Sequence, residues 1–201
     1  MRYEQCALGK LKYVVRYPDG FSADEKYPLI FCLHGAGYRG GDYDRIMANP
    51  FFKETEKQEG FPFVMAAPIC SEDTWFDLWG ELKTLVVKLA SQSFVDVKRI
   101  YMMGASMGGY HSVNLYLRRP GLFGGCLSLS GQFGADFFFK GYSDINVYYN
   151  SPVDYLPSMS PDHPLVEQYR KGRIILCCGQ GQWENEAKAE ARVLKEQFER
   201  L

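Results

Sequence analysis

A serine stands among glycines where an apolar run meets an amphipathic segment. The run 99–103 leads into Gly-Ala-Ser-Met-Gly at 104–108, and residues 107–118 are predicted to form a helix that Pro120 stops. The pattern Gly-x-Ser-x-Gly between a strand and a helix predicts a strained turn, because a Cβ beside the serine would clash. Such a turn holds the Ser106 hydroxyl clear at the head of a helix, where free N–H groups favour negative charge. Ser106 is therefore the predicted nucleophile.

The remaining sequence alternates apolar runs with helical segments. The continuous apolar character of the run 28–33 is typical of a parallel strand covered on both faces. Alternation of this kind predicts an α/β fold, a mostly parallel sheet with helices on both faces. Neither a linker nor a repeat interrupts it, so residues 1–201 are predicted to form a single domain. Strands are predicted over 8–16, 28–33, 61–67, 99–103, 125–129 and 173–178, and helices over 79–94, 107–118 and 185–201.

A second glycine-rich loop, His-Gly-Ala-Gly at 34–37, follows the strand predicted over 28–33. Sites in such sheets form at the carboxyl ends of the strands, so this loop and Ser106 are expected to face one crevice. The backbone N–H groups of Ala36 and Met107 are predicted to hold the oxyanion of a tetrahedral intermediate. His34 is interpreted as orienting the loop and not as a base. Four residues are predicted to line the substrate pocket: His34, Gly35, Gly37 and Trp75.

The composition excludes several classes of partner. With 23 basic and 24 acidic residues the net charge is −1, which gives no indication of a nucleic-acid or membrane-surface partner. No apolar run approaches the roughly 18 residues that a membrane helix needs, and the start carries no secretory signal pattern. The six cysteines match no zinc spacing, so no metal is expected. They are interpreted as buried free thiols of a cytoplasmic protein, and a homo-oligomer is left open.

Two stretches carry a resemblance to a known family. FCLHGAG, and RIYMMGASMGGYHSVNLYLRRPGLFGGCLSLSG further on, resemble the α/β-hydrolase superfamily, and within it the bacterial esterases related to feruloyl esterases and S-formylglutathione hydrolases. The resemblance covers residues 29–201. It implies a serine carboxylic-ester hydrolase that forms an acyl-enzyme on Ser106, acts on a small-molecule ester and uses neither metal nor organic cofactor. Acyl transfer to an alcohol uses the same turn and is an alternative.

The catalytic acid departs from the family's pattern. The family's order is serine, then Asp or Glu, then His, with the acid after the strand that here is predicted over 173–178. Gln182 occupies the expected position and cannot carry a charge. Glu184 is the nearest ionisable substitute and is the predicted acid. Alternatively, Glu184 and Glu186 only favour the N-terminus of the last helix.

The catalytic histidine is the larger departure. His111 shares the helix of Ser106 and is predicted to point away from it, and His163 precedes the acid in a loop between two prolines. His163 stays open as a base, because a triad is recognised by its geometry. In relatives, a further strand and a histidine-bearing loop follow the helix predicted over 185–201. We therefore expect a C-terminally incomplete domain that lacks the last strand and the His loop, with an exposed sheet edge.

Two questions stay open at this point. Without a histidine after the acid, and with Gln182 in its place, the chain is either an enzyme or a non-catalytic binding protein of hydrolase fold. The stretch 131–171 is rich in aromatic residues, and the loop 70–76 follows the end of a strand. Both segments either line an acyl or aryl pocket over Ser106 or pack short helices against the sheet.

Overall fold

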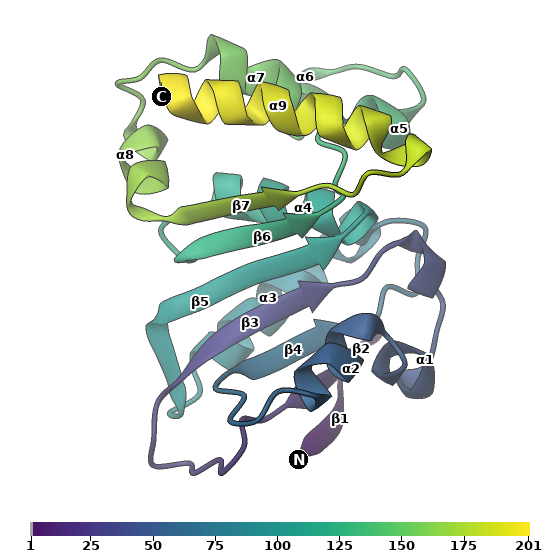
Figure 1. Ribbon diagram of the computed structural model, residues 1–201, viewed down its shortest axis with the longest axis vertical. Coiled ribbons are helices and arrows are strands. Elements are labelled where there is room, and N and C mark those ends of the chain that lie inside the picture. Colours follow the sequence, from purple (N-terminus) through teal and green to yellow (C-terminus); the bar gives the residue numbers. More distant parts are fainter. Residues whose placement is uncertain (1) are drawn as a thin grey trace.

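The computed structural model describes residues 2–201, except the side chains of Phe137 and Trp183. The described residues form a twisted sheet of seven strands in the order β1-β2-β4-β3-β5-β6-β7 (Figure 1). Neighbours from β4 to β7 run parallel, and β1 and β2 join antiparallel at one side. The predicted α/β class is confirmed. The strands are β1 Tyr3–Leu8, β2 Leu11–Arg16, β3 Tyr27–Leu33, β4 Val64–Pro68, β5 Val95–Ala105, β6 Gly125–Leu129 and β7 Arg173–Cys177.

The single strand predicted over residues 8–16 is wrong. The structure has a hairpin instead, in which β1 and β2 pair with Leu8 opposite Leu11. The chain reverses at Gly9, whose φ of 59° is readily adopted by glycine. Because the residues on either side of Gly9 are compatible with extended structure, they hide the reversal in the sequence. The other predicted strands agree with the structure to within a few residues at each end.

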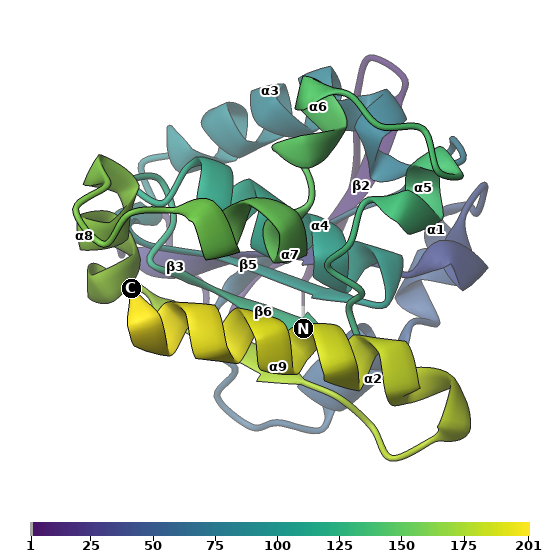
Figure 2. The ribbon, with the colours of Figure 1, turned by 90° about the horizontal axis from the view of Figure 1, so that it is seen from above.

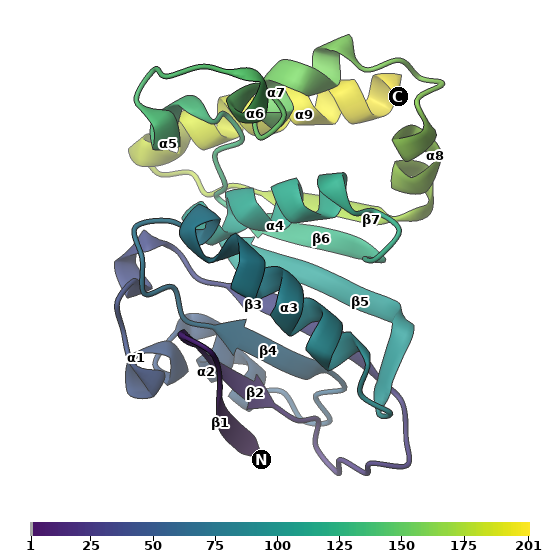
Figure 3. The same ribbon diagram turned by 180° about the vertical axis from the view of Figure 1, so that it is seen from behind.

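Helices cover the two faces of the sheet unequally. Helices α3 (Trp79–Ala90) and α4 (Met107–Arg118) lie together on one face (Figure 3). The predicted apolar stripe of α3 is buried there, at Leu82, Leu85, Val86 and Leu89. The opposite face carries two short helices, α1 (Tyr43–Met47) and α2 (Pro50–Glu56). They lie over the β1–β4 side of the sheet, and no helix stands in front of β5, β6 and β7 in Figure 1.

A long connection joins β6 to β7 and carries short helices. With the last helix, α9 (Asn185–Arg200), it forms a cap beside β7, seen from above in Figure 2. Leu194 of α9 is fully buried in the main core. Phe133 and Tyr155 of the aromatic-rich stretch are buried in the same core, so the stretch does pack short helices onto the fold. These helices are α5 Asp136–Phe139, α6 Ile145–Tyr148, α7 Pro152–Tyr155 and α8 Pro164–Lys171.

Within residues 2–201 the sheet ends at β7, which pairs with β6 alone. This is the exposed edge that the sequence predicts. Cys177 in β7 is exposed, and Cys178 and Cys6 are half-buried, so the prediction of buried thiols is wrong for these three residues. Cys6 and Cys177 lie in β1 and β7, the two outermost strands of the described sheet, where a strand has a neighbour on one side only. Among the described residues, no helix is both long and apolar enough to cross a membrane.

Candidate active site

Ser106 occupies a sharp turn between β5 and α4. Its backbone angles are φ 53° and ψ −121°, which an L-residue adopts only when the surrounding structure enforces them. The Ser106 N–H donates to the carbonyl of Leu129 at 2.8 Å, which anchors the turn to the end of β6. The residue is exposed, although its flanking segments are largely buried. The turn therefore presents its hydroxyl at the carboxyl end of the sheet.

Glycine is required on both sides of Ser106. A Cβ built on Gly104 would lie 2.2 Å from the carbonyl oxygen of Gly108. A Cβ on Gly108 would lie 1.9 Å from the carbonyl oxygen of Leu33. Both obstacles are backbone atoms, which cannot swing aside as a side chain does. The two glycines thus allow the head of α4 to close against the end of β3.

The loop 34–37 lies directly beside Ser106. A Cβ built on Gly35 would be 3.2 Å from the Ser106 Cβ and 3.8 Å from its Oγ. Ala36 begins a 3₁₀ helix and Met107 begins α4. The first N–H groups of a helix have no acceptor within the helix, so neither of these two amides has a helical hydrogen-bond partner. Both residues line the cavity that contains Ser106.

The buried His34 ring links the loop 34–37 to Cys70. Its Nε2 accepts a hydrogen bond from the Cys70 N–H at 2.9 Å, and its Nδ1 lies 2.8 Å from the carbonyl of Gly35. This network assigns the proton to Nδ1. Burial lowers the pKa of His34 to about 4, so the ring is neutral at pH 7. One nitrogen contacts Gly35 of this loop and the other contacts Cys70, which fits an orienting role and leaves no ring nitrogen for Ser106.

The cavity beside Ser106 has a volume of about 360 Å³. Arg39 joins two of its walls, because its guanidinium donates to the carbonyls of Ala36 and Asp73. The predicted pocket residues His34, Gly35, Gly37 and Trp75 are not among its lining; Trp75 is fully buried, and its indole N–H donates to the carbonyl of His34. The lining comprises Ala36, Arg39, Asp73, Thr74, Ser106, Met107, Tyr110, Ser130, Gln132, Phe138 and Lys140.

Several of these lining residues were not singled out from the sequence. The loop 70–76 contributes Asp73 and Thr74, and the aromatic stretch contributes Phe138, as one reading of those segments predicts. Arg39 and Ser130 were missed. The available signal for Ser130 was its place at the carboxyl end of β6, next to the strand that carries Ser106.

Glu184 lies between β7 and α9, where it is the N-cap residue of α9, and it is not among the residues that line this cavity. Its Oε2 accepts from the Gly179 N–H at 2.8 Å. A hydrogen bond from Ser130, followed in size by that of Gly179, holds the pKa of Glu184 below its ordinary value. Ser130 itself has a φ of 54°, so it shares the strained left-handed backbone of Ser106. The carboxylate thus contacts a second serine of the cavity.

We expect Ser130→Gly to raise the pKa of the Glu184 carboxyl. The substitution removes the hydroxyl that stabilises the carboxylate, and glycine adopts φ 54° without strain. Carbon-13 NMR titration of labelled glutamates measures the change. Lys188→Gln is the control and should shift the titration less, because that charge is the smallest of the named influences. An unchanged midpoint in Ser130→Gly would contradict the hydrogen bond.

The other two histidines do not reach Ser106. His111 is fully buried, with its ring 4.6 Å from the ring centroid of Phe76 and neither ring nitrogen hydrogen-bonded. His163 caps the N-terminus of α8 and lies beside the C-terminal end of α4. Since a twelve-residue helix is about 18 Å long, His163 is remote from Ser106. His163 is therefore not the base of this site, and His111 has the structural place that the sequence predicts.

No group of three or more His, Cys, Asp or Glu residues that could hold a metal ion is found in the described part of the chain. The groups that surround Ser106 are two helix-terminal amides, a strained second serine with its glutamate, and a partly aromatic cavity wall. This arrangement can bind and polarise a carbonyl group. It offers a hydroxyl for attack but no imidazole in contact with it.

The fold and the turn at Ser106 define the class of protein. A mostly parallel sheet with its serine at a strand-to-helix turn is the α/β-hydrolase arrangement. Residues 73–199 match the esterase family model described as "Putative esterase". The match covers more than half of the chain, which therefore belongs to this esterase family.

Individual relatives agree with this assignment. The chain is 27% identical over 128 residues to "Probable feruloyl esterase C" of Aspergillus niger, which covers 60% of this chain and 46% of the relative. The aligned part thus spans about half the length of that relative.

Solved structures share the fold at low identity. A ferulic acid esterase superposes with a TM-score of 0.73 at 17% identity, over 98% of this chain and 86% of that one. The S-formylglutathione hydrolase of Staphylococcus aureus superposes with a TM-score of 0.69 at 14% identity, over 98% of this chain and 84% of that one. A mutant feruloyl esterase module from Clostridium thermocellum, complexed with sinapinate, superposes with a TM-score of 0.70 at 16% identity. The superposition covers 100% of this chain and 73% of that one.

Proposed function

We propose that this chain is a serine carboxylic-ester hydrolase that works through an acyl-enzyme on Ser106. The observation that carries the proposal is the exposed Ser106 at a strained turn, with the loop 34–37 against it. Membership of the esterase family supports ester hydrolysis as the reaction class. The whole protein's substrate is proposed only as a class, an aryl or short acyl ester. Tyr110 and Phe138 in the cavity wall support that class.

In the proposed reaction, the Ser106 oxygen attacks the ester carbonyl carbon, and the carbonyl electron pair moves onto oxygen. The Ala36 and Met107 N–H groups stabilise this oxyanion, and one such donor is typically worth about 3–4 kcal/mol. Collapse of the intermediate breaks the bond between the carbonyl carbon and the ester oxygen, which takes up the proton lost by Ser106 and leaves as the alcohol, and the acyl group stays on Ser106. Attack by water then releases the acid and restores the hydroxyl.

The described residues place no base in contact with Ser106 that could remove its proton. None of its three imidazoles contacts Ser106, and Glu184 bonds Ser130 and Gly179. We propose Glu184 as the acid that orients a base supplied from outside the described residues. Without a base, related triads retain only about 10³–10⁴-fold catalysis over water. Turnover by these 201 residues alone is therefore expected to be low and to rise when free imidazole is added.

The test compares wild type with Ser106→Ala. We expect a fluorescent organophosphonate to label only the wild type, and p-nitrophenyl acetate turnover to rise with imidazole only in the wild type. Peptide mapping should place the label on Ser106. Ser91→Ala, an exposed serine at the end of α3, is the matched control and should behave as wild type. Equal labelling or equal turnover in Ser106→Ala would exclude this mechanism.

A second candidate function is binding without catalysis. The observation that favours it is the absence of an imidazole contact at Ser106 among the described residues. Such a protein would hold an ester or its acid in the cavity and leave it unchanged. Wild type that neither labels nor turns over ester with imidazole, yet binds an aryl carboxylic acid by calorimetry, would favour this second candidate. Acyl transfer to an alcohol remains a variant of the first, which product analysis separates.

A further inference from the structure

Three non-glycine residues of the described chain have a positive φ, and all of them line the cavity that contains Ser106. They are Ser106, Ser130 and Lys140, with φ values between 52° and 54°. Such a backbone is strained for a residue with a Cβ, and it is found mainly at functional sites. Ser106 is the proposed nucleophile and Ser130 binds Glu184, whereas the proposed reaction does not use Lys140.

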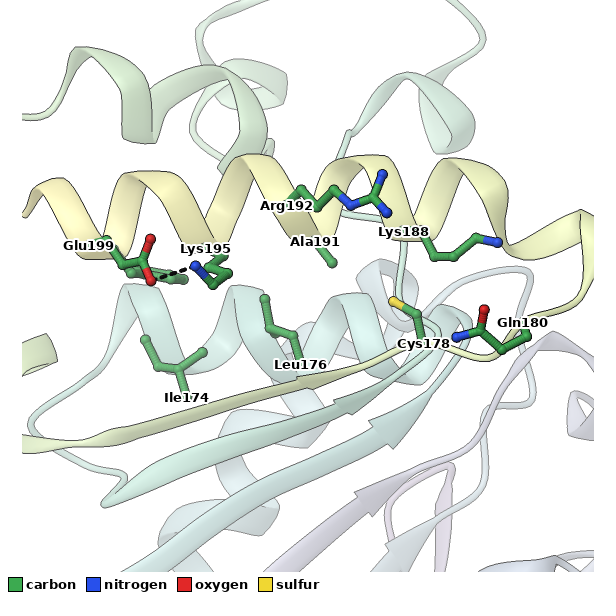
Figure 4. Close-up of a pocket in the computed structure, with 10 residues that line it drawn as sticks. Ile174, Leu176, Cys178, Gln180, Lys188, Ala191, Arg192, Lys195 and Glu199 are labelled. Carbon is green, nitrogen blue, oxygen red and sulfur yellow. Dashed lines mark hydrogen bonds and ion pairs between the residues drawn. The ribbon is translucent and has the colours of Figure 1, made fainter.

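The left-handed backbone of Lys140 separates its ammonium group from the acidic residue one helical turn before it. The short helix α5 ends immediately before Lys140, whose N–H donates to the carbonyl of Asp136 at 2.9 Å. Within a longer helix these two residues would have the spacing that favours an ion pair. Lys195 and Glu199 of α9 have this spacing and pair at 2.5 Å (Figure 4). Lys140 has no ion pair within 4.0 Å among the residues that the structure describes.

The lining of the cavity carries one excess positive charge. Its charged side chains are Arg39, Lys140 and Asp73. The Asp73 carboxylate lies 3.8 Å from the Arg39 guanidinium, so these two charges balance each other. The exposed ammonium of Lys140 is therefore the unbalanced charge of the lining, although the chain as a whole has a net charge of −1.

Carboxylates lie behind another part of the lining. Glu184 accepts a hydrogen bond from Ser130, and Glu186 accepts one from the Gln132 amide at 2.6 Å. An anionic group of a ligand would be repelled from that part of the lining and attracted to Lys140. The charges therefore favour one orientation of an anionic ligand.

Phe138 connects Lys140 to the proposed acyl pocket. Its ring lies 4.7 Å from the ring of Tyr110, and both side chains line the cavity. Phe138 belongs to α5, and Lys140 directly follows that helix. Because one short segment supplies both the ring and the ammonium, an acyl group that packs on Phe138 can be held at its far end by Lys140.

We propose that Lys140 determines specificity by binding a carboxylate in the acyl part of the ester, so that the preferred substrate is a monoester of a dicarboxylic acid. This inference rests on the proposed hydrolysis at Ser106 and narrows its substrate class. A lysine ammonium is a compact point charge on a flexible stem, which suits a carboxylate at the end of a chain.

The first test measures binding without turnover, in a Ser106→Ala background. Monoethyl adipate and ethyl hexanoate have acyl chains of equal length that end in a carboxylate and in a methyl group. We expect Lys140→Gly to shift the ratio of their dissociation constants, measured by NMR titration, about two- to fivefold toward the hexanoate, the range of an exposed ion pair. Lys140→Glu should shift it further. Since glycine adopts φ 52° without strain, Lys140→Gly should keep or raise the urea midpoint.

The second test measures turnover with imidazole added. Mono-p-nitrophenyl adipate and p-nitrophenyl hexanoate share a leaving group, and the ratio of their kcat/KM values should fall by the same factor in Lys140→Gly. Sodium chloride at about 0.5 M should lower the ratio in the wild type and not in Lys140→Gly. Lys83→Gln removes one exposed positive charge from α3, outside the lining, and should keep the wild-type ratio.

Unchanged ratios in both Lys140 variants would overturn the proposal and leave ester hydrolysis at Ser106 intact. A shift in binding without any turnover by the wild type would instead support the carboxylate site and contradict the proposed hydrolysis. An equal shift in Lys83→Gln would assign the effect to the overall charge of the protein, and would also overturn the role of Lys140.

Discussion

Replacing Gly108 with alanine is expected to lower the free energy of unfolding by at least about 3 kcal/mol, or to prevent folding. The added Cβ would meet the carbonyl oxygen of Leu33 at 1.9 Å and that of His34 at 2.8 Å. Relief requires α4 to separate from the end of β3, which are elements of the same core. Urea unfolding followed by circular dichroism measures the loss.

Gly80→Ala is the matched control for this experiment. Gly80 lies in α3, and a Cβ there would meet no heavy atom within 4 Å. Alanine also costs less backbone entropy in a helix, so a gain of about 0.5–1 kcal/mol is expected. If Gly108→Ala were as stable as wild type, the close contact between the Ser106 turn and the loop 34–37 would be wrong. The geometry proposed for the oxyanion would then fail with it.

Acid is expected to destabilise the protein steeply below pH 6.5, through two buried histidines. Burial lowers the pKa of His34 to about 4 and that of His111 to about 3. In the unfolded chain both would titrate near 6.5. Between these values the unfolded state binds more protons, so the free energy of unfolding falls as the pH falls. Each histidine contributes about 1.4 kcal/mol per pH unit, and the contribution is fully restored above pH 6.5.

His111→Leu separates the two contributions. The His111 ring has no hydrogen-bond partner to lose and lies among Phe76, Tyr110 and Phe138, so leucine should cost little at pH 7. We expect the variant to lose about half of the slope between pH 6.5 and 4 in urea unfolding at fixed ionic strength. A slope identical to that of wild type would show that His111 is not buried in its neutral form.

Local sequence patterns predicted most of the parallel part of the fold. The strand before Ser106 and the helix 107–118 follow from glycine spacing, apolar runs and Pro120, all of which act over a few residues. The hairpin at Gly9 was missed because its turn is short and its flanks are compatible with one long strand. The exposure of Cys177 was missed because burial depends on which strand lies at the edge, a property of the whole sheet.

For the candidate site as well, features set by local sequence could be predicted, and features set by contacts between distant segments could not. The strand-to-helix turn at Ser106 and the glycine-rich loop 34–37 could be placed at strand ends from the sequence, because each directly follows an apolar run. The roles of Arg39 and Ser130 could not be predicted, because they depend on contacts between distant loops: Arg39 with Asp73, and Ser130 with Glu184. Likewise, Trp75 was expected in the substrate pocket but packs beneath the loop 34–37. A position at the end of a strand does not tell whether a side chain points into the cavity or into the core.

The neighbourhood of Gly35 and Ser106 has a consequence for how the molecule acquires its shape. These two residues meet although about seventy residues separate them, and β3 pairs with β5 across the same interval. Closure over such a span is slow and entropically costly. During synthesis, the loop at 34–37 has to wait until α4 has left the ribosome. The candidate active site is thus completed as a late event of folding.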